Sequence, residues 1–230
     1  MLEYKKTKGT FTLRRMFPSL EDKDITLLQE NSSVIRLRKT QNLFISGDTP
    51  RNIYGLANGC LKIVRESQEG ESVITRIVRP GQVLGIREVF GGFKYSRTAV
   101  ALKDSEAFSI SSSIIFDLLS KSPQLAMHFI KVFCHELSRL EKRLESDVYV
   151  SAKNRVGTVI FDLFNLFAEE GTTKFEPPLN RKDIADLADV TPETVSRSIA
   201  QFKTAGLIET RGQAFHIVNL DAFINEIDER

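Results

Sequence analysis

Residues 180–207 constrain the fold of this 230-residue chain more than any other segment. They have the pattern of two short helices joined by a tight turn at Asp189. After the turn, Thr191 stands at an N-cap position, where its hydroxyl can accept a backbone N–H, and Pro192 follows at the first helical position. Apolar residues of the second helix that are expected to face the first are Val195, Ile199 and Phe202. The segment therefore predicts a helix-turn-helix.

The polar side chains of the second helix are expected to point outward. They are Glu193, Thr194, Ser196, Arg197 and Gln201. A helix start that displays a carboxylate, hydroxyls and a guanidinium is suited to reading base edges in the major groove of DNA. The alternative is an ordinary helical hairpin with a solvated polar face.

A predicted β-hairpin follows the second helix. Residues 207–210 and 214–218 have strand-like composition, and the turn between them is expected at Gly212. A helix-turn-helix followed by such a hairpin is typical of a winged helix, which favours the DNA-reading interpretation.

The overall charge gives only weak support for a polyanionic partner. The net charge is +2, and the cations of the helix-turn-helix are offset by nearby carboxylates. DNA affinity would therefore depend on individually positioned cationic side chains and backbone N–H groups. Two copies of the chain on one duplex would strengthen the binding.

Cysteine usage and hydropathy favour an intracellular protein. Cys60 and Cys134 are far apart and form neither a disulfide framework nor a metal-ligand pair. No secretory signal and no apolar stretch long enough to cross a bilayer is recognisable. We expect a cytoplasmic protein in a reducing compartment that has no membrane partner.

Residues 33–110 alternate short β-rich runs with turn residues. The runs predicted as strands are 34–38, 42–46, 53–57, 60–65, 72–78, 98–101 and 107–110. The turns are predicted at Gly47-Asp48, Asn58-Gly59, Glu69-Gly70, Pro80-Gly81 and Gly91-Gly92. Strands this closely spaced favour an antiparallel β-barrel or roll that can close around a small ligand.

A long helix is predicted to begin at Pro123. Its apolar residues alternate spacings of four and three, as in the seam of a coiled coil. The seam residues expected at a dimer interface are Ile130, Phe133, Leu137, Leu140 and Leu144. The heptad period and the length favour a homodimer, although one amphipathic helix packed on its own domain would also show an apolar stripe.

The predicted fold class is α+β, in three parts. Residues 1–119 form an antiparallel β-roll that serves as an effector or sensor domain, 120–150 a dimerisation helix, and 151–230 a winged helix-turn-helix. Further helices are predicted at 20–29, 111–119 and 152–169. The basic arm, residues 1–17, has little periodicity and is expected to be a partly mobile terminus.

This order of parts resembles the CRP/FNR family of bacterial transcription regulators over residues 18–222. In the roll, the matching positions are Gly47-Asp48, Tyr54, Gly59, 61–64, Arg79-Pro80-Gly81 and Gly85. The more specific matches are C-terminal, at Arg181, 183–185, 193–197 and 206–208. Asp189 stands where the family usually has glycine, and aspartate tolerates left-handed geometry. The resemblance implies a cyclic-nucleotide-binding-like roll, a homodimer, and contacts with double-stranded DNA and RNA polymerase.

The recognition helix resembles the FNR branch of the family. Glu193, Ser196 and Arg197 have its Glu-Ser-Arg spacing, which implies half-sites close to TTGA arranged as an inverted repeat. Arginine can bond guanine twice, and a carboxylate can accept from cytosine. The candidate DNA contacts are Arg181, Thr191, Glu193, Thr194, Ser196, Arg197 and Gln201.

The effector is less well indicated. Arg97-Thr98 match the phosphate pair of the family's cyclic-AMP site, where a guanidinium can grip a phosphate or carboxylate. Ile86 replaces the glutamate that holds the ribose, and Leu140-Glu141 replace hydroxyl residues that meet the purine, so cyclic AMP is not favoured. Arg97 could instead bond loop carbonyls. The candidate contacts of an unidentified small effector are Gly85, Ile86, Arg87, Arg97, Thr98, Leu140 and Glu141.

No cofactor, metal or catalytic residue is predicted. Two scattered cysteines cannot supply the four thiolates of an FNR-type iron–sulfur cluster, so that cluster is not expected. No nucleophile motif, zinc spacing or P-loop supports an enzyme. Two alternatives to an effector-controlled regulator remain open: a cyclic-AMP-responsive regulator, and an effector-binding module whose winged helix contacts proteins.

Overall fold

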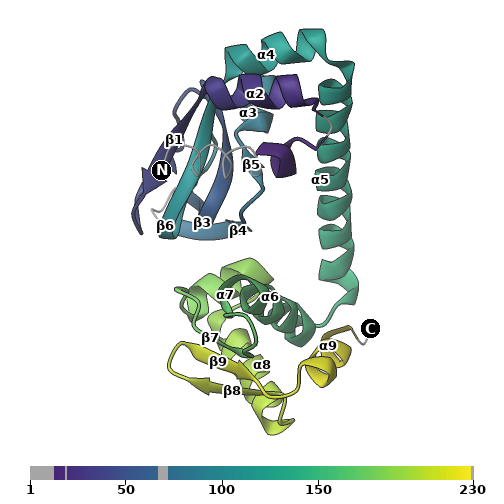
Figure 1. Cartoon of the computed structure of the whole chain (residues 1–230). Helices are drawn as coiled ribbons and strands as arrows, with labels where there is room; N and C mark the ends of the chain where they lie inside the picture. The colour runs from purple at the N-terminus through teal and green to yellow at the C-terminus, as the bar shows by residue number, and fades with distance from the viewer. Residues whose placement is uncertain (1–12, 19, 67–71, 229–230) are drawn as a thin grey trace. The chain divides into compact units, whose positions relative to one another are not determined.

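The computed structural model describes residues 13–18, 20–66 and 72–228, with side-chain positions for all of these except Arg139 and residues 142–149. The chain forms two compact units, one made of residues up to 72 and 76–139, and the other of residues from Leu140 onward together with residues 73–75. Figure 1 labels their helices and strands.

The first unit contains an antiparallel sheet in the strand order β1-β6-β3-β4 (Figure 1). The strands on this path are β1 (Ser32–Leu37), β6 (Thr98–Ser111), β3 (Asn52–Glu66) and β4 (Ser72–Val78). The short strands β2 (Asn42–Phe44) and β5 (Val83–Leu84) pair with β6 and β3. The sheet and the helices around it confirm the predicted α+β class.

The strands β3 and β6 are longer than the sequence predicts. The predicted turn at Asn58-Gly59 is wrong, because β3 continues through it as a β-bulge with shifted register against β6. Gly59 adopts a φ of 93°, and a Cβ atom there would lie 2.6 Å from the Cα of Ser105. Glycine therefore lets the two strands approach closely at the bulge. The runs 98–101 and 107–110 likewise belong to a single strand.

One hydrophobic core lies among the strands of the sheet and includes Leu56, Leu61 and Val78, and another lies between the sheet and the helices. These helices are α2 (Asp22–Glu30), α3 (Ile86–Gly91) and α4 (Ser112–Lys121). The predicted turn at Gly91-Gly92 is instead the end of α3, where Gly92 caps the helix with left-handed geometry. The turn predicted at Glu69-Gly70 lies outside the described residues.

The end of the N-terminal arm belongs to this core. Leu13, Met16 and Phe17 are at most 3% exposed and pack among residues such as Leu28 and Phe129. The expectation of a mobile arm is wrong for these residues, because three large apolar side chains gain more from burial than the ordering of the backbone loses. Residues 1–12 lie outside the description.

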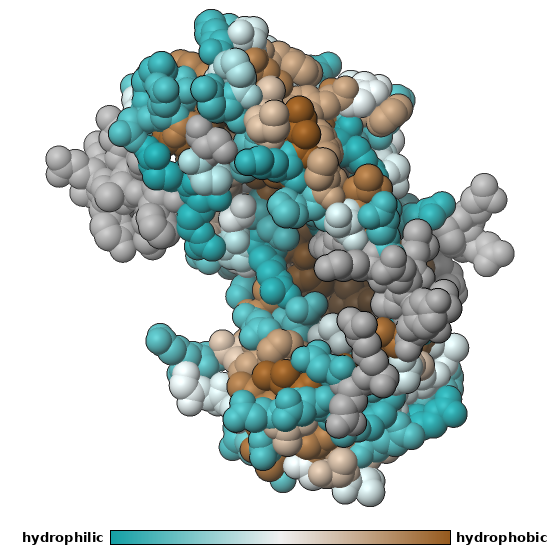
Figure 2. Space-filling model, turned by 90° about the vertical axis from the view of Figure 1, so that its right-hand side faces the viewer, coloured by the Kyte–Doolittle hydropathy of each residue, from teal (hydrophilic) through white to brown (hydrophobic). Residues whose placement is uncertain are grey.

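The helix α5 (Pro123–Tyr149) runs without interruption for 27 residues. Leu125 and Phe129 belong to the core of the first unit, while the face of α5 that carries the predicted seam is open to solvent. Figure 2 faces the outer side of α5 and shows brown and tan apolar side chains among hydrophilic ones.

The second unit is a helical bundle with a small sheet. Its elements are α6 (Ala152–Phe167), β7 (Lys174–Phe175), α7 (Arg181–Ala188), α8 (Pro192–Thr204), β8 (Ile208–Arg211), β9 (Ala214–Ile217) and α9 (Leu220–Asp228). The predicted hairpin is confirmed as β8 and β9, which turn at Gly212. Two elements were not among those predicted: β7, which pairs with β9, and α9, whose Phe223 and Ile227 complete the core.

Candidate nucleic-acid interface and effector pocket

The turn between α7 and α8 is built by local capping. Asn180 and Asp183 form a capping box at the start of α7, with hydrogen bonds of 2.9 and 2.8 Å. Asp189 ends α7 with a φ of 53°, the left-handed conformation expected of it. Thr191 caps α8 by accepting from the backbone N–H of Thr194 at 3.3 Å. These bonds fix the direction in which α8 leaves the turn.

Replacing Thr191 with alanine should lower the free energy of unfolding by about 0.5–2 kcal/mol, because the N–H of Thr194 loses its side-chain acceptor. Urea denaturation followed by circular dichroism measures the change. Thr191→Ser, which keeps the acceptor, should retain most of the stability. Equal losses in the two variants would contradict the capping role.

The two faces of α8 are divided as predicted. Val195, Ile199 and Phe202 are at most 5% exposed and face the bundle. On the other side, Thr194 is half-buried, and the exposed side chains are Thr191, Glu193, Ser196, Arg197 and Gln201. The first two turns of α8 thus present a polar surface to solvent.

The exposed groups of α8 are held by short-range bonds. Nη2 of Arg197 donates to Oγ1 of Thr194 at 3.4 Å, and the Ser196 hydroxyl donates to the carbonyl of Pro192 at 3.0 Å. Hydrogen bonds from its own backbone N–H and from the Thr191 hydroxyl lower the pKa of the Glu193 carboxyl. Glu193 is therefore an ionised acceptor at neutral pH, beside a guanidinium donor.

Arg181 is set apart from this surface. It opens α7, is half-buried, and its guanidinium carbon lies 5.1 Å from the ring centroid of Phe215 on β9. Burial lowers the pKa of Arg181, although a guanidinium remains charged at neutral pH. The stacking fixes this cation against the wing.

The seam residues of α5 are exposed apolar side chains. Ile130, Phe133, Leu137 and Leu140 have exposed fractions of 52, 39, 58 and 56%. The side chain of Leu144 lies outside the description. A row of large apolar groups in contact with water is a typical marker of an interface.

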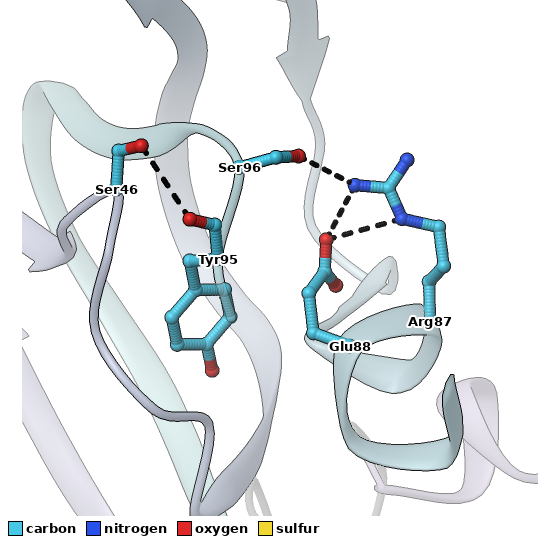
Figure 3. A network of polar contacts seen from close by, with 5 residues as sticks. All are labelled: Ser46, Arg87, Glu88, Tyr95 and Ser96. Atoms are coloured by element: carbon cyan, nitrogen blue, oxygen red, sulfur yellow. Dashed lines mark hydrogen bonds and ion pairs between the residues drawn. The ribbon is translucent and has the colours of Figure 1, made fainter. Parts of the chain in front are cut away.

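The candidate effector contacts near α3 already have internal partners. The Thr98 hydroxyl accepts from the backbone N–H of Ser46 at 3.1 Å. Arg87 bonds the Glu88 carboxylate at 2.5 Å and the Ser96 hydroxyl at 3.0 Å, as Figure 3 shows. A ligand phosphate would compete with Glu88 and Ser96 for the donors of Arg87, whereas the Thr98 hydroxyl could still donate its own proton.

The loop between α3 and β6 is fixed by Tyr95. Its backbone carbonyl accepts from the Ser46 hydroxyl at 3.4 Å (Figure 3), and its ring stacks on Phe44 at 4.0 Å. Burial raises the pKa of Tyr95, which therefore stays neutral.

The start of α3 is closely packed. Gly85 caps the start of α3 with a φ of 83°, and a Cβ atom there would lie 3.0 Å from the carbonyl oxygen of Asn52. Ile86 is 7% exposed and belongs to the core.

A pocket of about 180 Å³ lies in the first unit between α5 and the β4–β5 region. It has both polar and apolar walls, including Arg76, Gln82, His128, Phe129 and Glu136. Arg76 and Glu136 form an ion pair of 3.5 Å across it. Among the predicted effector contacts, Ile86 lines this pocket, whereas Arg97 and Thr98 do not. No sequence pattern indicated the other lining residues, because they come from separate elements.

The cysteines do not fit an iron–sulfur cluster. Cys60 is 1% exposed within β3, and burial raises the pKa of its thiol to about 11, whereas Cys134 is exposed on α5. With two cysteines in the sequence, one chain cannot supply a four-thiolate ligand set. Within the described ranges, no group of three or more His, Cys, Asp or Glu side chains is placed to hold a metal ion.

None of the described helices combines the length and the apolar character that crossing a bilayer requires.

Two family models match the chain, one in each unit. Residues 34–122 match the cyclic nucleotide-binding domain, and residues 154–225 match the Crp-like helix-turn-helix domain. Among curated proteins, the regulatory protein HlyX of Actinobacillus pleuropneumoniae is 27% identical over 187 residues, which cover 80% of this chain and 78% of that protein. The fumarate and nitrate reduction regulatory protein of Escherichia coli is 26% identical over 188 residues, 81% of this chain and 75% of its own length. Both are named as regulators, in agreement with the prediction that the chain is not an enzyme.

Solved structures are similar to this chain in fold over most of its length. FixK2 from Bradyrhizobium japonicum has a TM-score of 0.71 at 22% identity and covers 84% of this chain and 96% of its own. A transcriptional regulator of the CRP/FNR family from Thermus thermophilus also has a TM-score of 0.71, at 20% identity, and covers 86% of this chain and 99% of its own. The two family models, which together cover most of the chain, and the curated relatives lead to one conclusion: the chain belongs to the CRP/FNR family of transcription regulators.

Proposed function

We propose that the chain acts as a homodimer that binds inverted-repeat DNA sites with TTGA-like half-sites. The observation that carries this proposal is the exposed set Glu193, Ser196 and Arg197 on the first turns of α8, with Val195 and Phe202 buried behind it. Arg197 would bond guanine O6 and N7, and Glu193 would accept from cytosine N4. Thr191, Thr194 and Gln201 would contact neighbouring bases or phosphates.

Dimerisation would supply the affinity that one copy lacks. The seam residues of α5 would pack against a second α5, which brings two recognition helices to one duplex with half-sites about one helical turn apart. Arg181, stacked on the wing, would add a phosphate contact apart from the recognition helix. From the family resemblance we also expect contact with RNA polymerase in the cytoplasm.

The first unit would bind a small effector other than cyclic AMP. Thr98 and Arg87 already have internal partners, and Ile86 offers no acceptor for a ribose hydroxyl. The pocket beside α5, which has an ion pair and apolar walls, is a better candidate, and Gly85 and Arg97 of the same unit remain candidates for further contacts. Leu140 and Glu141, the other two predicted contacts, belong to the second unit. A ligand there would act by favouring one arrangement of the dimer over another. The curated relatives named for anaerobic or fumarate and nitrate regulation do not identify that ligand for this chain.

Binding of purified full-length protein to a TTGA inverted-repeat duplex tests the DNA proposal directly. Arg197→Ala should reduce discrimination between this duplex and a scrambled one by about 1–3 kcal/mol, since the bidentate contact with guanine is lost. Arg197→Lys should recover little of it, because an ammonium cannot form the same planar pair of bonds. Fluorescence anisotropy at several salt concentrations measures both affinities.

Arg65→Ala is the matched control, because it removes one exposed cation from β3, outside the helix-turn-helix. It should leave discrimination unchanged. Equal affinity of the unsubstituted protein for the two duplexes would reject sequence reading and favour the alternative in which the winged helix contacts proteins.

A further inference from the structure

Arg155 makes an unusual set of contacts in the second unit. Its Nε donates to the carbonyl of Ala188 at 3.1 Å, and its Nη2 to the carbonyl of Asp189 at 3.1 Å. Its Nη1 donates to the carbonyl of Val150 at 3.3 Å. One guanidinium thus joins two segments that lie more than thirty residues apart in sequence.

The first of these segments is the turn before the recognition helix. Ala188 is the last residue of α7, and Asp189 is the left-handed residue that redirects the chain toward α8. The carbonyls at a helix C-terminus lack intrahelical partners, and a cation there is favoured by the helix dipole. Arg155 therefore satisfies carbonyls in the conformation that sets the direction of α8.

The second segment joins α5 to α6. α5 ends at Tyr149 and α6 begins at Ala152, so the Val150 carbonyl lies in the short connection between them. Ser151 caps α6 by accepting from the N–H of Asn154 at 3.1 Å, which holds the start of that helix and Arg155 with it. The three nitrogens of a guanidinium can bond both segments at once, whereas all the N–H groups of an ammonium lie on one nitrogen.

We propose that Arg155 is a positioning residue that couples the α5–α6 connection to the helix-turn-helix turn. A change in the path of the chain at Val150 alters the hydrogen bond that Nη1 makes and so shifts the guanidinium. This shift changes the bonds of Nε and Nη2 to Ala188 and Asp189, and with them the direction of α8. This inference rests on the proposed function, because it gives the recognition helix a link to the helix expected to form the dimer.

The test compares Arg155→Gln with the unsubstituted full-length protein by hydrogen exchange and DNA binding. The N–H groups of Asp189 and Val190 both donate to the Ala185 carbonyl and report on the turn. Exchange should accelerate by about tenfold in peptides that contain residues 188–190 and 150–152, given the loss of charge-assisted bonds. Peptides from β8 and β9 should be unchanged. Discrimination between the TTGA duplex and a scrambled duplex should fall, with an unchanged salt dependence on the scrambled duplex.

Lys153→Gln is the matched control. It removes the same charge from the same turn of α6, but the partners of Lys153 are the Glu226 carboxylate on α9 and the Phe202 ring on α8, not the carbonyls that Arg155 bonds. It should leave exchange at residues 188–190 unaltered. Arg155→Lys should restore only part of the protection, because one ammonium cannot reach both segments.

The other outcomes distinguish a failure of the coupling role of Arg155 from a failure of the proposed DNA-binding function. Unchanged exchange at either segment in Arg155→Gln overturns the coupling, as does accelerated exchange with unaltered DNA discrimination. A salt slope reduced by about one means that Arg155 contacts a phosphate instead. If the unsubstituted protein does not discriminate, the proposed function fails, and the exchange data alone decide whether Arg155 orders the turn.

Discussion

Replacing Leu137 with aspartate should yield a folded monomer whose affinity for an inverted-repeat duplex falls by roughly 10²–10⁴-fold, because the second half-site is no longer bound by a linked copy. Leu137 is 58% exposed within the chain, so the substitution removes little packing from one protomer. At a dimer seam, two such carboxylates would face each other in an apolar interface and would have to be desolvated. Sedimentation equilibrium gives the mass, and fluorescence anisotropy gives the affinity.

Ser138→Asp is the control for this substitution. It introduces the same charge at the next position of α5, which is exposed and off the seam. It should remain a dimer with nearly unchanged DNA binding. A dimeric Leu137→Asp, or a monomer that binds the duplex as tightly as the unsubstituted protein, would contradict the proposed use of this face.

Phe202→Ala should lower the free energy of unfolding of the DNA-binding unit by about 3–5 kcal/mol, the usual range for a buried phenylalanine. Phe202 is 0% exposed, and its ring meets Phe223 of α9 edge to face at 5.2 Å. It also packs where Gly157 lets α6 approach, since a Cβ atom at Gly157 would lie 2.9 Å from the ring. Removing the ring would leave a cavity where α6, α8 and α9 meet.

Urea denaturation read by hydrogen exchange separates the two units in this experiment. Peptides from residues 152–228 should lose protection at lower urea, while peptides from β3 and β6 keep theirs. Lys203→Ala, at the exposed neighbouring position, should shift neither set. A shift in Phe202→Ala no larger than that of Lys203→Ala would show that the site collapses without loss, contrary to the close packing described above.

The DNA-binding unit was predicted well because its signals are local. The cap at Thr191, the left-handed Asp189 and the spacing of Val195 and Phe202 all lie within a few residues of one another. Side-chain capping and helical periodicity depend mainly on neighbours in sequence, so these features could be identified without the fold.

The roll was predicted less well because its strands depend on partners far along the chain. Asn58-Gly59 has the composition of a hairpin turn, yet the structure uses Gly59 for a bulge against Ser105. The helix α3 and the burial of Met16 depend in the same way on surfaces supplied by distant segments. Propensity is a weak guide where such contacts decide the conformation.

The sequence by itself determined the α+β class, the helix-turn-helix with its wing, and the outward set that includes Arg197. Only the tertiary structure decided which cations have structural partners: Arg181 stacks on Phe215, Arg87 bonds Glu88 and Ser96, and Arg155 joins Val150 to Asp189. The physical reason is that a helix pattern repeats every few residues along the chain, whereas the partner of a long charged side chain is whichever group the fold brings within about 3 Å of it.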